Sequence, residues 1–186
     1  MSRLRIFDAS RNGGDATAGL VDQHEDGAAI AAALGAIGVR FERWPTRADV
    51  VAGAEPEAVL AAYEPEIRRL SEAEGYEAAD VVSMAPDHPE KAAMRRKFLD
   101  EHTHAEDEVR FFVDGAGLFT LHVGDRVYEI LCERGDLVSV PAGTRHWFDM
   151  GPDPSFVAVR LFTNPAGWVA EFTGDDIAAR FPRLAP

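Results

Sequence analysis

Cysteine and long apolar runs are nearly absent from this chain of 186 residues. Its single cysteine, Cys132, cannot form an internal disulfide, which favours a reducing compartment such as the cytoplasm. The N-terminus has no apolar run after its basic residues, and no segment approaches the ~20 apolar residues that cross a bilayer. We therefore expect a cytoplasmic chain with no membrane partner.

Positive charge is also scarce. The chain has 19 Lys and Arg against 32 Asp and Glu, a formal net charge of -13 at pH 7. An acidic surface repels phosphate backbones and anionic lipid, so we expect no nucleic-acid partner. If the ligand is an anion, local arginines must overcome this background. Hydrophobic residues make up 46% of the chain, which is typical of a globular protein with one sizeable core.

The chain shows no internal repeat, and its pattern changes near residue 98. Before that point, Asp26 is the expected N-cap of a helix that ends near Gly38. The other expected elements are strands over 3–9, 39–45 and 79–86 and helices over 56–74 and 89–99. We expect one domain over 1–186, in which 1–97 pack on a core of 98–165 and 166–186 form a loop and a last short helix.

The core segment is rich in short apolar or alternating runs that Gly-Asp, Pro-Ala-Gly and Pro-Asp-Pro turns separate. Strands are expected over 109–115, 117–125, 126–136, 137–143, 146–151 and 155–162. Many short strands at this spacing predict a sandwich or a small barrel.

Two histidines, His102 and His104, stand one residue apart at the start of this core. On an extended backbone their side chains point to the same face, so both imidazoles can bind one cation. Glu108 follows after a polar connection, and His146 comes after a Pro-Gly turn. Three imidazoles and a carboxylate suit Fe(II), Ni(II), Mn(II) or Zn(II), and a six-coordinate ion would keep two positions open for a chelating substrate. For the two histidines alone, a solvated loop is an equally good interpretation.

These residues resemble the two motifs of the cupin superfamily. The stretch His102-x-His104-x3-Glu108-x6-Gly115 is similar to the first motif, and Gly135-x5-Pro141-x-Gly143-x2-His146 is similar to the second. The resemblance implies a mainly β fold, the double-stranded β-helix or jelly-roll barrel, with the N-terminal α-helices flanking it, and makes 98–165 the metal-binding core. It leaves the reaction open, because cupins range from enzymes to storage proteins.

Three longer stretches are similar to a narrower family, the acireductone dioxygenases of bacterial methionine salvage. They are KFLDEHTHAEDEVRFFVDGAGLF, VPAGTRHWFDMG and DVVSMAPDHPEKAAMRRKFLDEH. The resemblance implies a metal-dependent dioxygenase that cleaves the aci-reductone 1,2-dihydroxy-3-keto-5-methylthiopentene with O2. It also implies one Fe2+ or Ni2+ ion per chain. The iron form gives 2-keto-4-methylthiobutyrate and formate, and the nickel form gives 3-methylthiopropionate, formate and carbon monoxide.

The same resemblance implies roles for single residues. His102, His104, Glu108 and His146 become the metal ligands. Arg110 is implied to hold the substrate dianion, Glu101 to act in metal incorporation and Asp107 to relay small conformational changes. Arg110 has independent support, because it shares strand parity with Glu108 and a positive charge favours the dianion.

Three further residues are expected near the substrate on weaker grounds. Arg160 lies in an otherwise apolar strand, so it either pairs with a structural carboxylate or contacts substrate oxygens. Phe148 shares the parity of His146, and Trp168 follows the last strand. Either aromatic side chain could line a pocket for the methylthio tail, although aromatic residues more often simply fill a core.

Two other functions share the ligand set. One is a non-catalytic cupin that binds a small acid as a sensor or store, and the other is a different metal-dependent cupin enzyme, such as a sugar isomerase. A regulator would carry a basic DNA-binding segment, which the alanine-rich, acidic N-terminal helices do not resemble. No long heptad run is present, so we expect a monomer.

Overall fold

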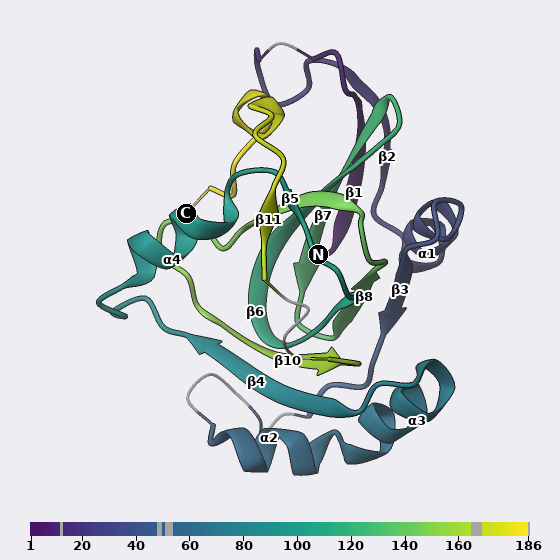
Figure 1. The fold of residues 1–186 in the computed structure, drawn as a ribbon, viewed down its shortest axis with the longest axis vertical. Coiled ribbons are helices and arrows are strands. Elements are labelled where there is room, and N and C mark those ends of the chain that lie inside the picture. The colour runs from purple at the N-terminus through teal and green to yellow at the C-terminus, as the bar shows by residue number, and fades with distance from the viewer. Residues whose placement is uncertain (12, 48–49, 51–53, 165–168, 186) are drawn as a thin grey trace.

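The computed structural model describes residues 1–11, 13–47, 50, 54–164 and 169–185, and strands dominate it (Figure 1). One group of antiparallel strands runs in the order β11 (Glu171–Phe172), β5 (His102–Thr103), β9 (Arg145–Asp149), β6 (Glu108–Val123), β7 (Arg126–Glu133), β1 (Arg3–Asp8), β2 (Leu20–His24). The second group runs in the order β4 (Ala78–Met84), β10 (Phe156–Phe162), β6, β8 (Asp136–Val140), β3 (Arg40–Arg43). The predicted jelly-roll fold is confirmed.

Strand β6 belongs to both groups. Its first half pairs with β8 and β10, and its second half pairs with β7 and β9. The sequence predicted two strands here, and that prediction was wrong: the strand bends at Gly115 instead of ending. Gly115 has a φ of 75°, and an added Cβ would lie 1.9 Å from the backbone oxygen of Ser155, so only glycine fits this bend.

Alternation along the first half of β6 separates two apolar layers. Val109, Phe111 and Val113 face the layer that helices α2 (Pro56–Ala62) and α3 (Glu64–Glu74) cover. Phe112 points the other way, into the larger cluster inside the barrel, on the side where Glu108 and Arg110 line a cavity. Because both faces are buried, this run has no polar face in its sequence.

The N-terminal helices flank the barrel as expected. Helix α1 (Gly27–Gly35) begins where the Asp26 side chain accepts a hydrogen bond from the Ala29 amide. The single helix expected over 56–74 is two helices that meet at the non-helical Tyr63, because Pro65 in the first turn of α3 has no amide hydrogen to continue the hydrogen bonds of α2. Helix α4 (Lys91–Phe98) leads into β5.

Several short elements escaped the sequence analysis. Strands β2, β5 and β11 were not predicted, and the two-residue strands β5 and β11 are too short to give a pattern. The last helical element is a 3-10 helix, Ile177–Arg180, which packs with Phe181 against Phe7 and Trp147. No helix in the described part of the chain is long and apolar enough to span a membrane.

Candidate metal centre

Three buried imidazoles converge from two short strands. His102 lies on β5, His104 directly follows that strand, and His146 lies on β9. Strand pairing places His102 opposite His146, which brings together residues more than forty positions apart. One ring nitrogen from each histidine lies within 4.8 Å of the other two. The sequence-predicted histidines are therefore in one place, at a spacing that could hold an ion.

Backbone carbonyl groups fix the tautomer of all three rings. Each Nδ1 atom faces a carbonyl oxygen, that of Asp100 for His102 at 2.7 Å, of Thr144 for His146 at 2.7 Å and of Val169 for His104 at 3.2 Å. A carbonyl oxygen only accepts, so Nδ1 carries the proton and donates it. The lone pair then lies on Nε2, as is usual for histidines that bind metal.

Glu108, the first residue of β6, faces the same point. Its Oε2 lies 2.9 Å from the Nε2 of His146 and 3.4 Å from the Nε2 of His104. Burial raises the pKa of Glu108, but the charge of Arg110 and the hydrogen bonds from the two histidines outweigh it and hold the pKa well below 4.5. An ionised carboxylate facing two imidazole lone pairs needs a proton or a cation between them. The donor set therefore fits a divalent ion of the iron, nickel or zinc type.

The histidine pKa values agree with this arrangement. Burial, helped by the nearby His146, lowers the pKa of His102 to about 4, so this ring is neutral at pH 7. For His104, burial lowers the pKa, but the hydrogen bond and charge of Glu108 raise it overall. Metal ligands must be deprotonated, so a cation bound here would take the place of that proton.

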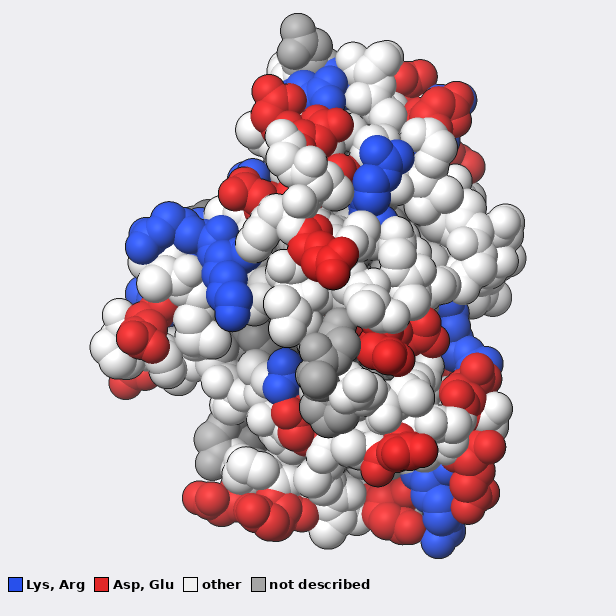
Figure 2. All heavy atoms as spheres, viewed as in Figure 1, with Lys and Arg blue, Asp and Glu red and all other residues white. Residues whose placement is uncertain are grey.

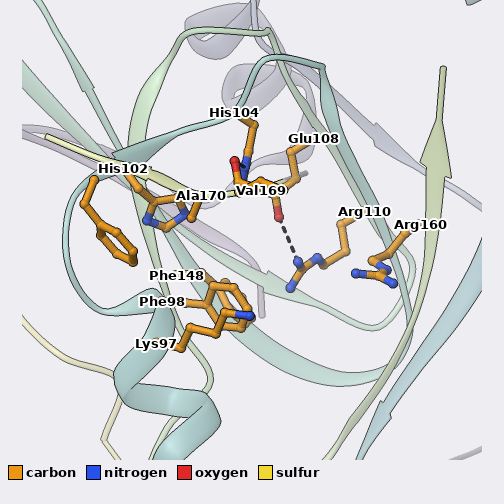
Figure 3. Close-up of a pocket in the computed structure, with 11 residues that line it drawn as sticks. Lys97, Phe98, His102, His104, Glu108, Arg110, Phe148, Arg160, Val169 and Ala170 are labelled. Carbon is orange, nitrogen blue, oxygen red and sulfur yellow. Dashed lines mark hydrogen bonds and ion pairs between the residues drawn. The ribbon is translucent and has the colours of Figure 1, made fainter. Parts of the chain in front are cut away.

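Arg110 points into the same cavity as Glu108, as strand parity predicted (Figure 3). Its NH2 group donates a hydrogen bond of 2.7 Å to the Oε1 of Glu108, and its guanidinium lies 4.7 Å from the centre of the Phe148 ring. Burial lowers the pKa of Arg110, although the carboxylate of Glu108 opposes this. A guanidinium stays charged under such shifts. The site thus offers a fixed positive charge beside the candidate ligands.

The cavity in front of these groups has a volume of about 320 Å³. Its charged lining residues are Lys97, Glu108, Arg110 and Arg160, and its other lining residues are Phe98, His102, His104, Phe148, Val169, Ala170 and Phe172. The volume is at the small end of the range for small-molecule sites. Aromatic and aliphatic walls with a few converging charges suit a small, partly apolar anion.

The comparisons with known proteins identify the family. The model of the ARD/ARD' family matches residues 15–170. The chain belongs to this family. The predicted family resemblance is confirmed.

Proteins similar in sequence to this chain include several acireductone dioxygenases. One from Stenotrophomonas maltophilia (strain R551-3) is 60% identical over 100% of this chain and 98% of its own length. Another, from Pseudomonas paraeruginosa (strain DSM 24068 / PA7), is 66% identical over 83% of this chain and 86% of its own length. Among solved structures, the acireductone dioxygenase from Bacillus anthracis with a cadmium ion in its active centre matches with a TM-score of 0.77 and 30% identity, covering 92% of this chain and 98% of that chain.

Asp107 connects the loop that carries His104 to the turn that precedes His146. Its Oδ1 accepts a hydrogen bond of 2.9 Å from the backbone amide of Ala142, in the turn between β8 and β9. The same turn donates from the Gly143 amide to the backbone oxygen of His104 at 2.9 Å. Two hydrogen bonds therefore link the loop that carries His104 to the turn that precedes His146.

Glu101 does not line the cavity, although it adjoins His102. It is buried and points to the opposite side of β5, where its Oε2 lies 2.7 Å from the Nδ1 of His122 on β6. Its Oε1 accepts a hydrogen bond of 2.9 Å from the Thr173 hydroxyl, just beyond β11. His122 lies one residue before the end of β6, and no local pattern in the sequence links it to Glu101.

Of the three residues expected near the substrate on weaker grounds, two line the cavity. Arg160 forms a two-pronged ion pair with Asp80 on the neighbouring strand β4, at 2.8 and 2.5 Å, and its side chain also lines the cavity. Phe148 is buried in the cavity wall. Trp168 lies outside the described residues.

Sequence reasoning missed several wall residues. Lys97 and Phe98 come from the end of α4, and Val169, Ala170 and Phe172 come from the segment at β11. The first pair directly precedes the ligand motif in KFLDEH, which was a usable signal. The second group has no motif, because only the return of the chain past β5 brings it to the cavity.

Proposed function

We propose that this chain holds one Fe2+ or Ni2+ ion through His102, His104, Glu108 and His146. With it, the chain cleaves the aci-reductone 1,2-dihydroxy-3-keto-5-methylthiopentene with O2 in methionine salvage. The enzyme class follows from family membership and from full-length likeness to acireductone dioxygenases. The observation that carries the ligand set is the convergence of three buried imidazoles on one point that an ionised carboxylate also faces.

The chemistry divides between the ion and the chain. A bound divalent ion supplies Lewis acidity and a template for a chelating substrate. Arg110 supplies a fixed charge that favours the ionised enediol, because a nearby positive group lowers the cost of removing the second proton. Glu108 orients this guanidinium through one oxygen while its other oxygen faces the imidazoles. Arg110 would then face the negative charge of a substrate bound at the ion that His102, His104, Glu108 and His146 would hold.

The supporting residues have proposed roles of two kinds. Glu101 keeps β5 in place and thereby favours metal incorporation, and Asp107 relays movement between the ligand-bearing segments. Phe148 and Trp168 are proposed to line the pocket for the methylthio tail. Arg160 is proposed to act from its ion pair with Asp80, as a second positive group facing substrate oxygens.

The identity of the ion sets the proposed products. The iron form gives 2-keto-4-methylthiobutyrate and formate, whereas the nickel form gives 3-methylthiopropionate, formate and carbon monoxide. Imidazole and carboxylate ligands suit both ions, so we expect the metal content to follow growth conditions. We also propose that the chain is a cytoplasmic monomer with one domain over 1–186. From its composition and charge, we propose that it has no nucleic-acid or membrane partner.

A two-part experiment tests this function. The purified protein is loaded with Fe2+ or with Ni2+, and the loss of aci-reductone absorbance is followed in air, with the products identified by mass spectrometry. Absence of oxygen-dependent consumption by both forms would refute the proposed activity. In the second part, His102→Ala should lose metal while retaining the circular-dichroism spectrum. His24→Ala serves as the control, because β2 is at the opposite end of the strand order from β5. Unchanged metal stoichiometry in His102→Ala would refute the ligand assignment.

A further inference from the structure

Positive side chains gather on α4, at one side of the cavity. Figure 2 shows Lys and Arg over this helix, whereas acidic side chains cover the α2 end of the molecule. The last turn of α4 carries three consecutive basic residues, Arg95, Arg96 and Lys97. Such residues interact favourably with the negative end of the helix dipole. The chain has a formal net charge of -13, so this turn is a positively charged region on a mostly acidic protein.

Lys97 is the member of this group that lines the cavity. Three cationic side chains line it, and the two deeper ones are neutralised by carboxylates: Arg110 by Glu108 and Arg160 by Asp80. Within the described ranges, no ion pair joins Lys97 to a carboxylate. Its ammonium lies 5.4 Å from the centre of the Phe98 ring, and Figure 3 shows the two side chains together among the residues that line the cavity.

The position of Lys97 is held by its neighbour two residues earlier. Arg95 makes a two-pronged ion pair with the buried Asp149 on β9, with Nε to Oδ1 at 2.7 Å and NH2 to Oδ2 at 2.9 Å. Phe98, which follows Lys97, is itself part of the cavity wall. Arg96 and Lys97 are both exposed to solvent, but of the two only Lys97 lines the cavity.

We propose that Lys97 is a substrate-binding residue that draws the anionic substrate into the cavity and holds it at the mouth. The inference rests on the proposed function and names a contact for that same site. An anion approaching a chain of this charge is repelled over most of the surface, and a cleft with positive walls raises its local concentration. Lys97 therefore acts on substrate capture, and Arg110 acts on substrate ionisation deeper in the cavity.

Steady-state kinetics on the metal-loaded protein test this role. Lys97→Met should lower kcat/KM by about tenfold at low salt through a higher KM, with kcat within about twofold of wild type. Lys97→Arg should restore most of the loss, because it keeps the charge. Arg96→Met is the matched control, since it removes the same charge from the same helical turn without lining the cavity, and it should stay close to wild type.

Ionic strength supplies the second readout. The gap in kcat/KM between wild type and Lys97→Met should close near 1 M salt, where the screening length is about 3 Å. Equal kcat/KM values for wild type and Lys97→Met at low salt would overturn the inference while leaving the proposed activity intact. An equal loss in Arg96→Met would overturn it as well, because net charge alone would then explain the effect. Absence of turnover in the wild type would instead refute the proposed function.

Discussion

Asp149 offers the clearest quantitative test of how the cavity wall is held. Its buried carboxylate accepts four hydrogen bonds: from the Nε and NH2 of Arg95, from the Gly151 amide at 2.8 Å and from the Leu184 amide at 3.0 Å. These bonds join α4, β9 and the C-terminal segment. Asp149→Ala removes all four acceptors at once and leaves two amides and a guanidinium without their partners.

The magnitude follows from the burial of each group. Breaking a fully buried ion pair costs about 3–5 kcal/mol, but the Arg95 side chain is 22% exposed and water can reach it, so we take about 3 kcal/mol. For a chain of this size, that corresponds to a fall in Tm of roughly 6–12 °C. Asp149→Asn keeps one acceptor oxygen and should cost about half as much. Because α4 carries Lys97 and Phe98, kcat/KM should fall as well.

Urea denaturation measures these differences, with Asp153→Ala as the control. Asp153 also pairs with a residue of α4, Lys91, but it is 64% exposed, so its loss should change stability by less than about 0.5 kcal/mol. A cost below about 1 kcal/mol for Asp149→Ala, or a cost equal to that of the control, would refute the reasoning.

The pH dependence of stability in wild type and in Asp149→Asn gives an independent test. Burial raises the pKa of Asp149, but its hydrogen bonds with Arg95 and two backbone amides lower the pKa overall from the ordinary value of 3.8. A group whose pKa is lower in the folded than in the unfolded protein adds its full stability at pH values above the unfolded pKa. This stability is lost as the pH falls from the unfolded pKa through the folded pKa. The gap between wild type and Asp149→Asn should therefore be full at pH 7 and shrink below about pH 4. A gap of constant size would contradict the assignment.

Two further predictions concern the site and the barrel. Glu101→Gln should lower metal affinity by roughly tenfold, because it weakens the contacts with His122 and Thr173 beside the strand that carries His102. Chelator competition measures the affinity, and an unchanged value would show that Glu101 does not act on the metal centre. Gly115→Ala should destabilise the fold by roughly 3 kcal/mol or more, because it combines a positive φ with a clash at Ser155; a urea midpoint near that of wild type would show that the bend tolerates a side chain.

Local patterns in the sequence predicted the parts of the site that depend on spacing along one strand. His102 in β5 and His104 just after it share a face, and Glu108 and Arg110 share another, because side chains alternate with a period of two. The return of His146 was predicted from the cupin motifs, since no local pattern links residues so far apart. The resemblance thus supplied what periodicity could not.

Features that depend on partners from distant strands were out of reach. Asp114 and Gly115 resemble a turn, and only the approach of the Ser155 backbone makes that glycine a bend within a continuous strand. The partner of Arg160 was expected to be some carboxylate, but its identity depends on the register between β10 and β4. The break near Pro65 was different, because a proline inside a helical pattern is a local signal that the prediction should have used.

Strand β6 also determines how the site can open. It carries Glu108 and Arg110 near one end and the partner of Glu101, His122, near the other, and it is hydrogen-bonded to four other strands along its length. Local opening requires a segment with few long-range contacts, whereas β6 pairs with four other strands. We therefore expect the amide hydrogens of β6 to exchange only when both groups of strands open together. The rigidity of the candidate centre is a property of the whole barrel and not of the short strands that carry the histidines.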